Sequence, residues 1–298
     1  MIKILFIGCV KSSERMLDKL INMEVEIVGV VTKRKSTFNS DFCDLKVLAT
    51  KNDISCIYAE NINDKYIVNF AKEKKPDLIY CFGWSELLGN EILSIPTKGC
   101  VGHHPTELPY NRGRHPQIWA LVLGLKKTAS TFFMMKEGAD DGDIISQEEL
   151  LIDIDDDAMS LYKKIDEIAL KQIEKFTNDF INNTVKYIKQ DNSKANYWRK
   201  RTKADGKIDW RMSSICIYNL VRALTKPYIG AHLECNGNEY KVWKTKLIKN
   251  DSNLYDNIEY GKVIKVKKDL SFIIKTGDGI IEVVDYERFP IKEGDYII

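Results

Sequence analysis

The chain has 298 residues, of which 44% are hydrophobic, and its 45 basic and 43 acidic side chains give a formal net charge of +2. This length and composition are typical of a soluble globular protein with one large or two ordinary domains. The near balance of charge excludes an overall field that would draw the whole molecule to nucleic acid or to an anionic membrane.

The first apolar run, Ile2–Ile7, ends at Gly8. It is far shorter than the roughly 18 residues that span a bilayer, and it lacks the features of a signal peptide. We therefore expect a first β-strand, no membrane association and a cytoplasmic location. The seven cysteines are widely spaced without a Cys-x-x-Cys pair, which predicts buried free thiols in a reducing compartment and no metal site.

Strand-like and helix-like segments alternate through the first hundred residues. The predicted strands are Ile2–Ile7, Val25–Val31, Ile54–Tyr58, Leu78–Phe82 and Gly99–His103. The predicted helices begin at Ser12 or Ser13 and then cover Leu45–Lys51, Lys65–Glu73 and Ser85–Leu93. This alternation predicts an α/β fold, with a doubly wound, Rossmann-like, mostly parallel sheet and helices on both faces. The turn Gly8–Ser13 lacks the Gly-x-Gly-x-x-Gly fingerprint, so a nicotinamide cofactor is not expected.

Further along, helices are predicted over Pro116–Leu123 and Asp156–Phe180, and strands over Ala129–Met135 and Ile144–Ile152. The polar stretch Asn182–Lys207 predicts a linker between two domains, residues 1–190 and 206–298. After a helix over Met212–Leu224, five short β-like runs are separated by Gly-containing turns. These runs are Tyr228–Leu233, Tyr240–Ile248, Gly261–Val266, Ser271–Thr276 and Gly279–Val284. They predict a small C-terminal β-barrel of the OB type.

The stretch Cys100–Trp119 holds three of the four histidines, two arginines and three prolines directly after a predicted strand. The carboxyl end of a strand in an α/β sheet is where such a fold binds ligands, so this stretch predicts the functional site. An acidic turn, Asp140–Asp143, follows about 30 residues later.

Two motifs in these regions resemble the folate-dependent formyltransferase family. They are His-Pro-x-x-Leu-Pro-x-x-Arg-Gly at His104–Gly113 and Gly-Ala-Asp-Asp-Gly-Asp-Ile at Gly138–Ile144. The resemblance continues through Phe82–Ser85 and Arg199–Thr202 and covers nearly the whole chain. It implies a Rossmann-type N-terminal domain that takes N10-formyltetrahydrofolate as co-substrate and transfers its formyl group to an amine.

In that family an Asn-x-His motif and a distant Asp carry catalysis, which implies catalytic roles for His104 and Asp140. The family's Asn falls on Gly102, where this chain has no side chain to polarise the formyl oxygen, and the loss of one such donor costs about two to three orders of magnitude in rate. Formyl transfer to an ammonium-forming amine requires a base that titrates near neutrality, and His104 fits that role. Asp140 would orient the imidazole and stabilise its protonated form.

The resemblance also implies a binding role for neighbouring residues. It assigns folate binding to Phe82, Gly83, Trp84 and Asp141, and acceptor binding to Arg112, Gly113, Arg114 and Arg201. Trp84 has a second interpretation, as a residue of the hydrophobic core. Arg201 likewise has a second interpretation, as an exposed charge in the linker. His103 is either a packing residue or a substitute oxyanion contact.

A nucleotide-linked amino sugar is the expected acceptor, for example a precursor of a nonulosonic acid such as pseudaminic acid, because Arg201–Gly206 resembles a signature of sugar N-formyltransferases. The alternatives are methionyl-tRNA formyltransferase and an inactive folate- or nucleotide-binding homologue. Residues 206–298 hold fifteen Lys and Arg against thirteen Asp and Glu, which disfavours a nucleic-acid partner. The oligomeric state stays open, a homodimer included.

Overall fold

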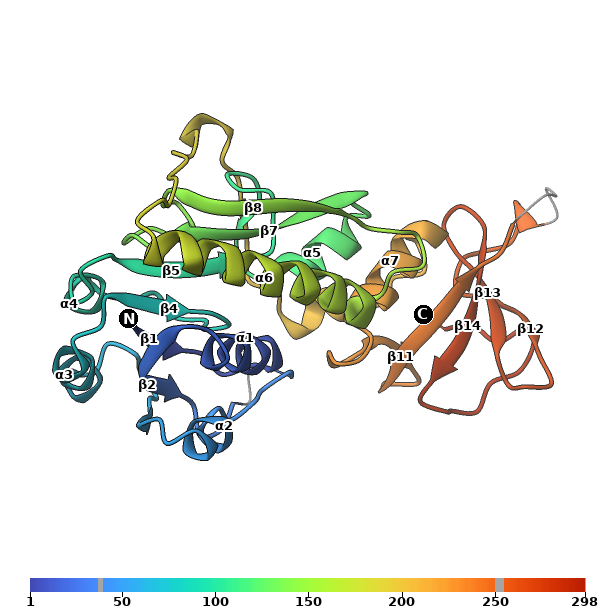
Figure 1. Cartoon of the computed structure of the whole chain (residues 1–298). Helices are drawn as coiled ribbons and strands as arrows, with labels where there is room; N and C mark the ends of the chain where they lie inside the picture. The colour runs from blue at the N-terminus through green and yellow to red at the C-terminus, as the bar shows by residue number, and fades with distance from the viewer. Residues whose placement is uncertain (37–39, 250–254, 298) are drawn as a thin grey trace. The chain divides into compact units, whose positions relative to one another are not determined.

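The computed structural model describes residues 1–36, 40–249 and 255–297 (Figure 1). Contacts divide the chain into two compact units, and each is described by itself. The first consists of Met1–Pro116, Lys127–Leu151 and Lys163–Arg199, and the second of Gln117–Lys126, Ile152–Tyr162 and Lys200–Ile298. Two segments inside the expected first domain, 117–126 and 152–162, thus have most of their contacts with the second unit.

The first unit is built on a seven-stranded sheet with the strand order β3-β2-β1-β4-β5-β7-β8. The strands are β1 (Ile2–Ile7), β2 (Val25–Thr32), β3 (Cys56–Tyr58), β4 (Leu78–Cys81), β5 (Cys100–His104), β7 (Lys127–Met134) and β8 (Ile144–Leu151). All pairs from β3 to β5 are parallel, and β7 pairs antiparallel with both of its neighbours. The predicted Rossmann-like, mostly parallel sheet is confirmed.

Helices cover both faces of this sheet. On one face α1 (Lys11–Ile21), α2 (Lys46–Lys51) and α6 (Ala158–Ile181) pack over a core that includes Phe6, Tyr80 and Phe132. On the other face α3 (Lys65–Lys74) and α4 (Asn90–Leu93) pack over Leu5, Ile79 and Cys100. Burial on both faces is the physical reason for the continuous apolar runs in β1 and β4.

The helix predicted over Ser85–Leu93 is only the single turn α4. Gly89 is its N-cap residue, and the Gly89 N–H donates to Asn63 Oδ1 at 2.6 Å. The preceding residues form a loop at the carboxyl end of β4. The strand order reverses between β1 and β4, and a Cβ on Gly8, just after β1, would come within 2.7 Å of the Phe82 carbonyl oxygen, just after β4. This is the position where open α/β sheets bind ligands.

The segment expected as a linker is divided between the units: its part up to Arg199 belongs to the first unit, and its part from Lys200 belongs to the second. Residues Tyr197–Trp198 form β9, which pairs in parallel with β6 (Arg112–Gly113), and η1 (Asn192–Lys194) precedes it. Although its composition is polar, this part of the segment is not a flexible linker. Its side chains and backbone bind the loop that follows β5.

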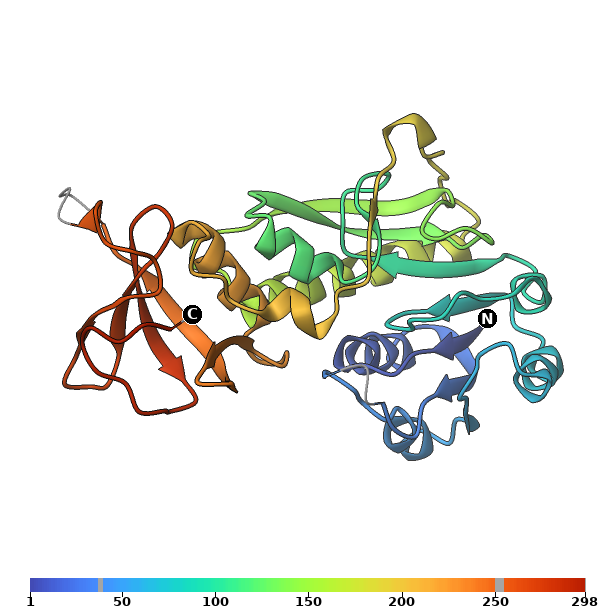
Figure 2. The same cartoon turned by 180° about the vertical axis from the view of Figure 1, so that it is seen from behind.

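The second unit contains α5 (Pro116–Val122) apart from its first residue, η2 (Lys203–Gly206), α7 (Ser214–Leu224) and a five-stranded antiparallel sheet (Figure 2). The sheet order is β10 (Ala231–Cys235), β11 (Asn238–Leu247), β14 (Ile280–Tyr286), β13 (Phe272–Lys275) and β12 (Val263–Val266). The predicted small antiparallel domain is confirmed. Its sheet has two ends, and among the described residues no pairing joins β10 to β12 to close a barrel. In the described part of the chain no helix is long and apolar enough to cross a membrane.

Candidate active site

His104 is the last residue of β5, and only 5% of it is exposed. Its Nε2 lies 2.8 Å from the carbonyl oxygen of Asn111, in the loop that follows the strand. A carbonyl oxygen can only accept, so Nε2 carries the proton of this bond. The other ring nitrogen, Nδ1, is therefore the atom at which His104 gains or loses a proton.

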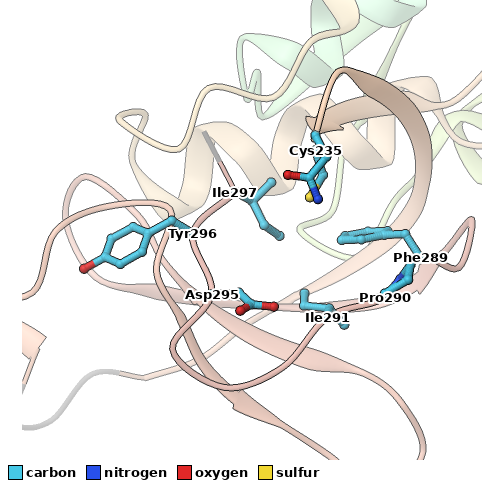
Figure 3. Close-up of a pocket in the computed structure, with 8 residues that line it drawn as sticks. Cys235, Phe289, Pro290, Ile291, Asp295, Tyr296 and Ile297 are labelled. Carbon is cyan, nitrogen blue, oxygen red and sulfur yellow. The ribbon is translucent and has the colours of Figure 1, made fainter.

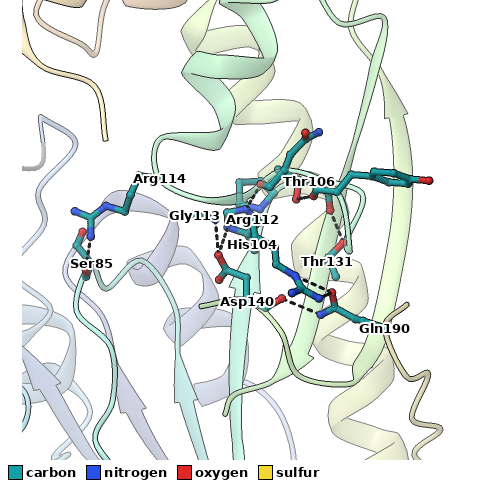
Figure 4. A network of polar contacts seen from close by, with 12 residues as sticks. Ser85, His104, Thr106, Arg112, Gly113, Arg114, Thr131, Asp140 and Gln190 are labelled. Carbon is teal, nitrogen blue, oxygen red and sulfur yellow. Dashed lines mark hydrogen bonds and ion pairs between the residues drawn. The ribbon is translucent and has the colours of Figure 1, made fainter. Parts of the chain in front are cut away.

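Asp140 faces that nitrogen. Its Oδ2 lies 3.6 Å from His104 Nδ1 and accepts a hydrogen bond of 2.9 Å from the Gly113 N–H (Figure 4). At this distance the carboxylate and the ring interact directly, because little water intervenes between them. The two residues that the sequence selected, 36 positions apart, are thus brought together as a His–Asp pair.

The turn that carries Asp140 is tight. Asp140 adopts a positive φ of 55°, a conformation that Asp tolerates better than most residues. A Cβ on Gly142 would lie 1.5 Å from the Met134 carbonyl oxygen, so only glycine fits there. The Asp-Asp-Gly-Asp sequence is therefore a backbone requirement of the β7–β8 turn as well as a source of charge.

Gly113 is held by the strand pair β6–β9. Its φ is +104°, and a Cβ would lie 2.5 Å from the Trp198 carbonyl oxygen. Gly113 therefore takes part in the site through its backbone, because its N–H donates to Asp140.

Arg112 lies differently from the prediction. It is 2% exposed, and its guanidinium donates to Gln190 Oε1, Asn192 Oδ1 and the Tyr197 hydroxyl at 2.7 to 3.2 Å. An arginine so engaged cannot offer a bidentate fork to a phosphate without breaking these bonds. These bonds tie the loop to residues 190–197, and acceptor binding by Arg112 stays a prediction.

His103 points to the opposite face of the sheet, because consecutive strand residues alternate. Its ring stacks on Phe132 at 4.5 Å and its Nε2 lies 2.9 Å from Ser130 Oγ. Burial, reinforced by the neighbouring His104, lowers the pKa of His103 to about 3. These contacts are those of a packing residue, and a part for His103 in stabilising an oxyanion stays a prediction to be tested.

Gly102 lies on the same face of β5 as His104. A Cβ at Gly102 would come within 2.8 Å of Phe133 Cζ and 3.0 Å of Met135 Cγ. Side chains from β7 and the turn after it therefore fill the space beside residue 102. An Asn side chain at this position would need that space.

Phe82, Gly83 and Trp84 lie at the carboxyl end of β4, as predicted. Phe82 is buried in the core against Phe6 and Phe132, and Gly83 has a φ of +69°. Trp84 Nε1 is buried without a hydrogen-bond partner in the described structure, and so is Asp141 Oδ1. Arg114 connects two site loops, since its Nη1 donates to the Ser85 carbonyl at 2.7 Å.

Arg201 belongs to the second unit and is 8% exposed, not an open linker charge. Its guanidinium stacks on Trp119 at 4.7 Å and donates to the Asp205 carbonyl. The Thr202 N–H donates to the Asp205 carboxylate. The Arg201–Gly206 signature therefore forms a closed turn.

A small cavity of about 170 Å³ lies in the second unit (Figure 3). Its lining consists of Cys235, Asn236, Phe289, Pro290, Ile291, Asp295, Tyr296 and Ile297. None of the predicted site residues takes part in it.

Sequence reasoning missed Gln190, which lies in the supposed linker. Its Nε2 donates to the carbonyl oxygens of Asp140 at 2.9 Å and Gly142 at 2.6 Å, while its Oε1 accepts from Arg112. No local pattern marks it, because a Gln in an Asn- and Lys-rich stretch resembles any solvated loop residue.

Two family models match the chain. The model described as formyl transferase matches residues 2–175, and the model described as formyl transferase, C-terminal domain, matches residues 200–289. Methionyl-tRNA formyltransferase of Alkaliphilus oremlandii is 32% identical over 291 residues, which are 96% of this chain and 91% of that protein. The bifunctional polymyxin resistance protein ArnA of Wigglesworthia glossinidia brevipalpis is 33% identical over 233 residues, 78% of this chain and 36% of that protein.

Among solved structures, WlaRD, a sugar 3N-formyl transferase crystallised in the presence of dTDP and 5-N-formyl-THF, has a TM-score of 0.72 at 22% identity and covers 97% of this chain and 99% of its own. The N-formyltransferase from Helicobacter canadensis, in complex with folinic acid and dTDP-3-aminofucose, has a TM-score of 0.71 at 22% identity, with 96% and 100% covered. At this identity the two structures show a shared fold. From the family models and the curated relatives, the chain belongs to the formyl transferase family and is a formyl-transferring enzyme.

Proposed function

We propose that this enzyme transfers the formyl group of N10-formyltetrahydrofolate to the amine of a nucleotide-linked amino sugar. The observation that carries the proposal is the His104–Asp140 pair, with Nδ1 and Oδ2 3.6 Å apart at the carboxyl edge of the sheet. Support for the sugar comes from the two sugar N-formyltransferases whose folds match over nearly the full length of the chain.

The chemistry assigns a task to each atom of the pair. A bond forms between the acceptor nitrogen and the formyl carbon, the bond from that carbon to N10 breaks, and the proton lost by the amine ends on N10. The imidazole takes up the proton at Nδ1, and the Asp140 carboxylate stabilises the resulting charge. The Asp140 side chain, 19% exposed against 6% for His104, is the more accessible member of the pair.

Residues around the end of β4 would hold the folate. Trp84 Nε1 would donate to the pterin and Asp141 Oδ1 would accept from it, since both atoms are buried and unpaired in the described structure. Arg114 would keep the two loops around this region together through Ser85. The folate supplies the activated formyl group, and these residues orient it.

Methionyl-tRNA formyltransferase is the second candidate, because the relative with that activity is 32% identical over 96% of this chain. The near-neutral charge of residues 206–298 favours the sugar, since a tRNA-binding surface gains most of its affinity from phosphate contacts by Lys and Arg.

The test is a transfer assay with N10-formyltetrahydrofolate and a panel of UDP-, dTDP- and GDP-linked amino sugars beside Met-tRNA. Mass spectrometry of the acceptor should show a formyl group on one amino sugar. The variant His104→Ala should show no transfer and bind folate within a few-fold of the wild type. Transfer to Met-tRNA alone would establish the second candidate, and transfer to nothing would leave a folate- or nucleotide-binding homologue.

A further inference from the structure

Gln190 joins the turn that carries Asp140 to the loop segment around Arg112, which contacts the His–Asp pair. One of its polar atoms, Nε2, holds the Asp140 and Gly142 carbonyl oxygens at 2.9 and 2.6 Å, and therefore holds the β7–β8 turn. The other, Oε1, receives two hydrogen bonds from the Arg112 guanidinium, at 2.7 and 3.2 Å (Figure 4). Gln190 is 6% exposed, so water competes little for these bonds.

Both residues that orient His104 are attached to this connection. Asn111, whose carbonyl oxygen fixes Nε2, directly precedes Arg112, and Gly113, whose N–H fixes the Asp140 carboxylate, directly follows it. A shift of the Arg112 side chain would therefore move both contacts at once. Three charged or titratable residues surround His104 and this connection. Asp140 places its carboxylate at Nδ1, and His103 interacts electrostatically with His104 from the other face of the sheet. Arg112 contributes its guanidinium from the loop after β5.

We propose that Gln190 is a positioning residue for formyl transfer, and that it acts with Arg112 by setting the position of Asp140 against His104. The proposal rests on the proposed function only for its link to catalysis. A side-chain amide donates from its nitrogen and accepts at its oxygen, so Glu at position 190 would keep the bonds from Arg112 and lose those to the two carbonyl oxygens. Leu would lose all of them with little change in volume.

The experiment follows the ring resonances of His104 by NMR at one fixed pH, which requires neither folate nor acceptor. The chain has four histidines, and the signal that disappears in His104→Gln assigns the ring. Asp140→Asn should change the chemical shifts of the His104 ring, because Asp140 Oδ2 lies 3.6 Å from Nδ1. Gln190→Leu and Gln190→Glu should change the same resonances, because both lose the hydrogen bonds that hold the Asp140 turn.

The decisive comparison is the double variant Gln190→Leu with Asp140→Asn. If Gln190 acts through Asp140, the second change adds no further displacement of the His104 ring resonances. In the transfer assay Gln190→Leu should lower kcat by about tenfold to a hundredfold, because small misplacements of catalytic groups have effects of this size, and leave KM for folate within a few-fold.

Gln172→Leu is the matched control. Gln172 is fully buried and its Nε2 also bonds a carbonyl oxygen, that of Ser130, and in addition Ser146 Oγ. Gln172→Leu should lower stability without moving the His104 ring resonances. Unmoved His104 resonances in folded Gln190→Leu, an additive displacement in the double variant, or no effect of Asp140→Asn would each overturn the proposal. If Gln190→Leu does not fold, Gln190→Glu decides. Failure of every transfer assay would refute the proposed function and leave this result standing.

Discussion

At the scale of single residues, two adjacent histidines have opposite environments. His104 faces Asp140 through Nδ1, whereas His103 stacks on Phe132 and its pKa is lowered to about 3 by burial. The difference follows from strand geometry, which sends consecutive side chains to opposite faces. A titratable residue in a functional motif is therefore not by that fact a functional residue.

His103→Gln should separate packing from catalysis. Gln keeps a polar partner for Ser130 and removes the titratable ring, so we expect kcat for formyl transfer to fall by less than about tenfold. Loss of an oxyanion donor would cost about two to three orders of magnitude. A loss of that size in a folded variant would restore the oxyanion role.

The same variant makes a prediction for acid stability. The folded-state pKa of His103 lies below its unfolded value near 6.5, so the wild type loses stability as pH falls from about 6.5 toward 3. His103→Gln should lose less over this window when unfolding is followed by circular dichroism in urea at several pH values. The same pH dependence in both proteins would contradict the assignment.

At the scale of elements, the short pair β6–β9 determines where the loop after β5 lies. It brings the segment after α6 against the loop and leaves the Gly113 N–H directed at Asp140. Two residues per strand give no detectable β-pattern, and the partners are 85 positions apart. This pairing could not be read from the sequence, in contrast to the long apolar runs of β1 and β2.

Gly113→Ala tests this element. The Cβ would lie 2.5 Å from the Trp198 carbonyl oxygen, so the pair must separate, and the free energy of unfolding should fall by about 2 to 4 kcal/mol. Gly99→Ala is the control, since its φ of +94° is similar but its Cβ meets only the mobile end of Met134. Its cost should be about 1 kcal/mol from conformation alone. Equal losses in urea unfolding would argue against a specific role for β6–β9.

Sequence patterns predicted most elements because burial imposes them. The strands and helices of the first unit follow apolar periodicity, and the antiparallel sheet of the second follows its turns. The helix expected over Ser85–Leu93 failed in its first half, where Gly89 caps the helix late. The expected linker over Asn182–Lys207 contains the boundary between Arg199 and Lys200. The contact of its first part with the loop after β5 was not predicted, because polar side chains that bind one particular loop look like side chains that bind water.

At the scale of the whole molecule, the first unit depends on the packing of α1 and α6 on one face of its sheet. Arg15 on α1 and Asp166 on α6 form an ion pair of 2.9 Å, and the Asp166 side chain is 4% exposed. Burial raises the pKa of Asp166 to about 6, with Asp41 and Glu167 adding to the effect and Arg15 opposing it. Ionisation of this carboxyl group therefore opposes folding.

Asp166→Asn should make stability less dependent on pH. A folded-state pKa above the unfolded value near 3.9 means that the stabilisation is complete below about pH 4 and is lost as pH rises through about 6. The wild type should lose about 1 to 3 kcal/mol over this window relative to Asp166→Asn in urea unfolding. Asp18→Asn, an exposed change on α1, the helix that carries Arg15, should behave like the wild type. A steeper dependence in Asp166→Asn would contradict the sign.

The sequence by itself determined the fold class, the family and the identity of the His–Asp pair, because periodic burial and two contiguous motifs are local properties of the chain. Only the tertiary structure decided that Arg112 is buried, that His103 faces away from His104 and that Gln190 holds the turn that carries Asp140. These facts depend on contacts between residues that are tens of positions apart, and on which face of a strand each side chain takes. From the sequence alone, Arg112 and Gln190 resemble surface residues. Their burial follows from the contact between the loop after β5 and residues 190–197.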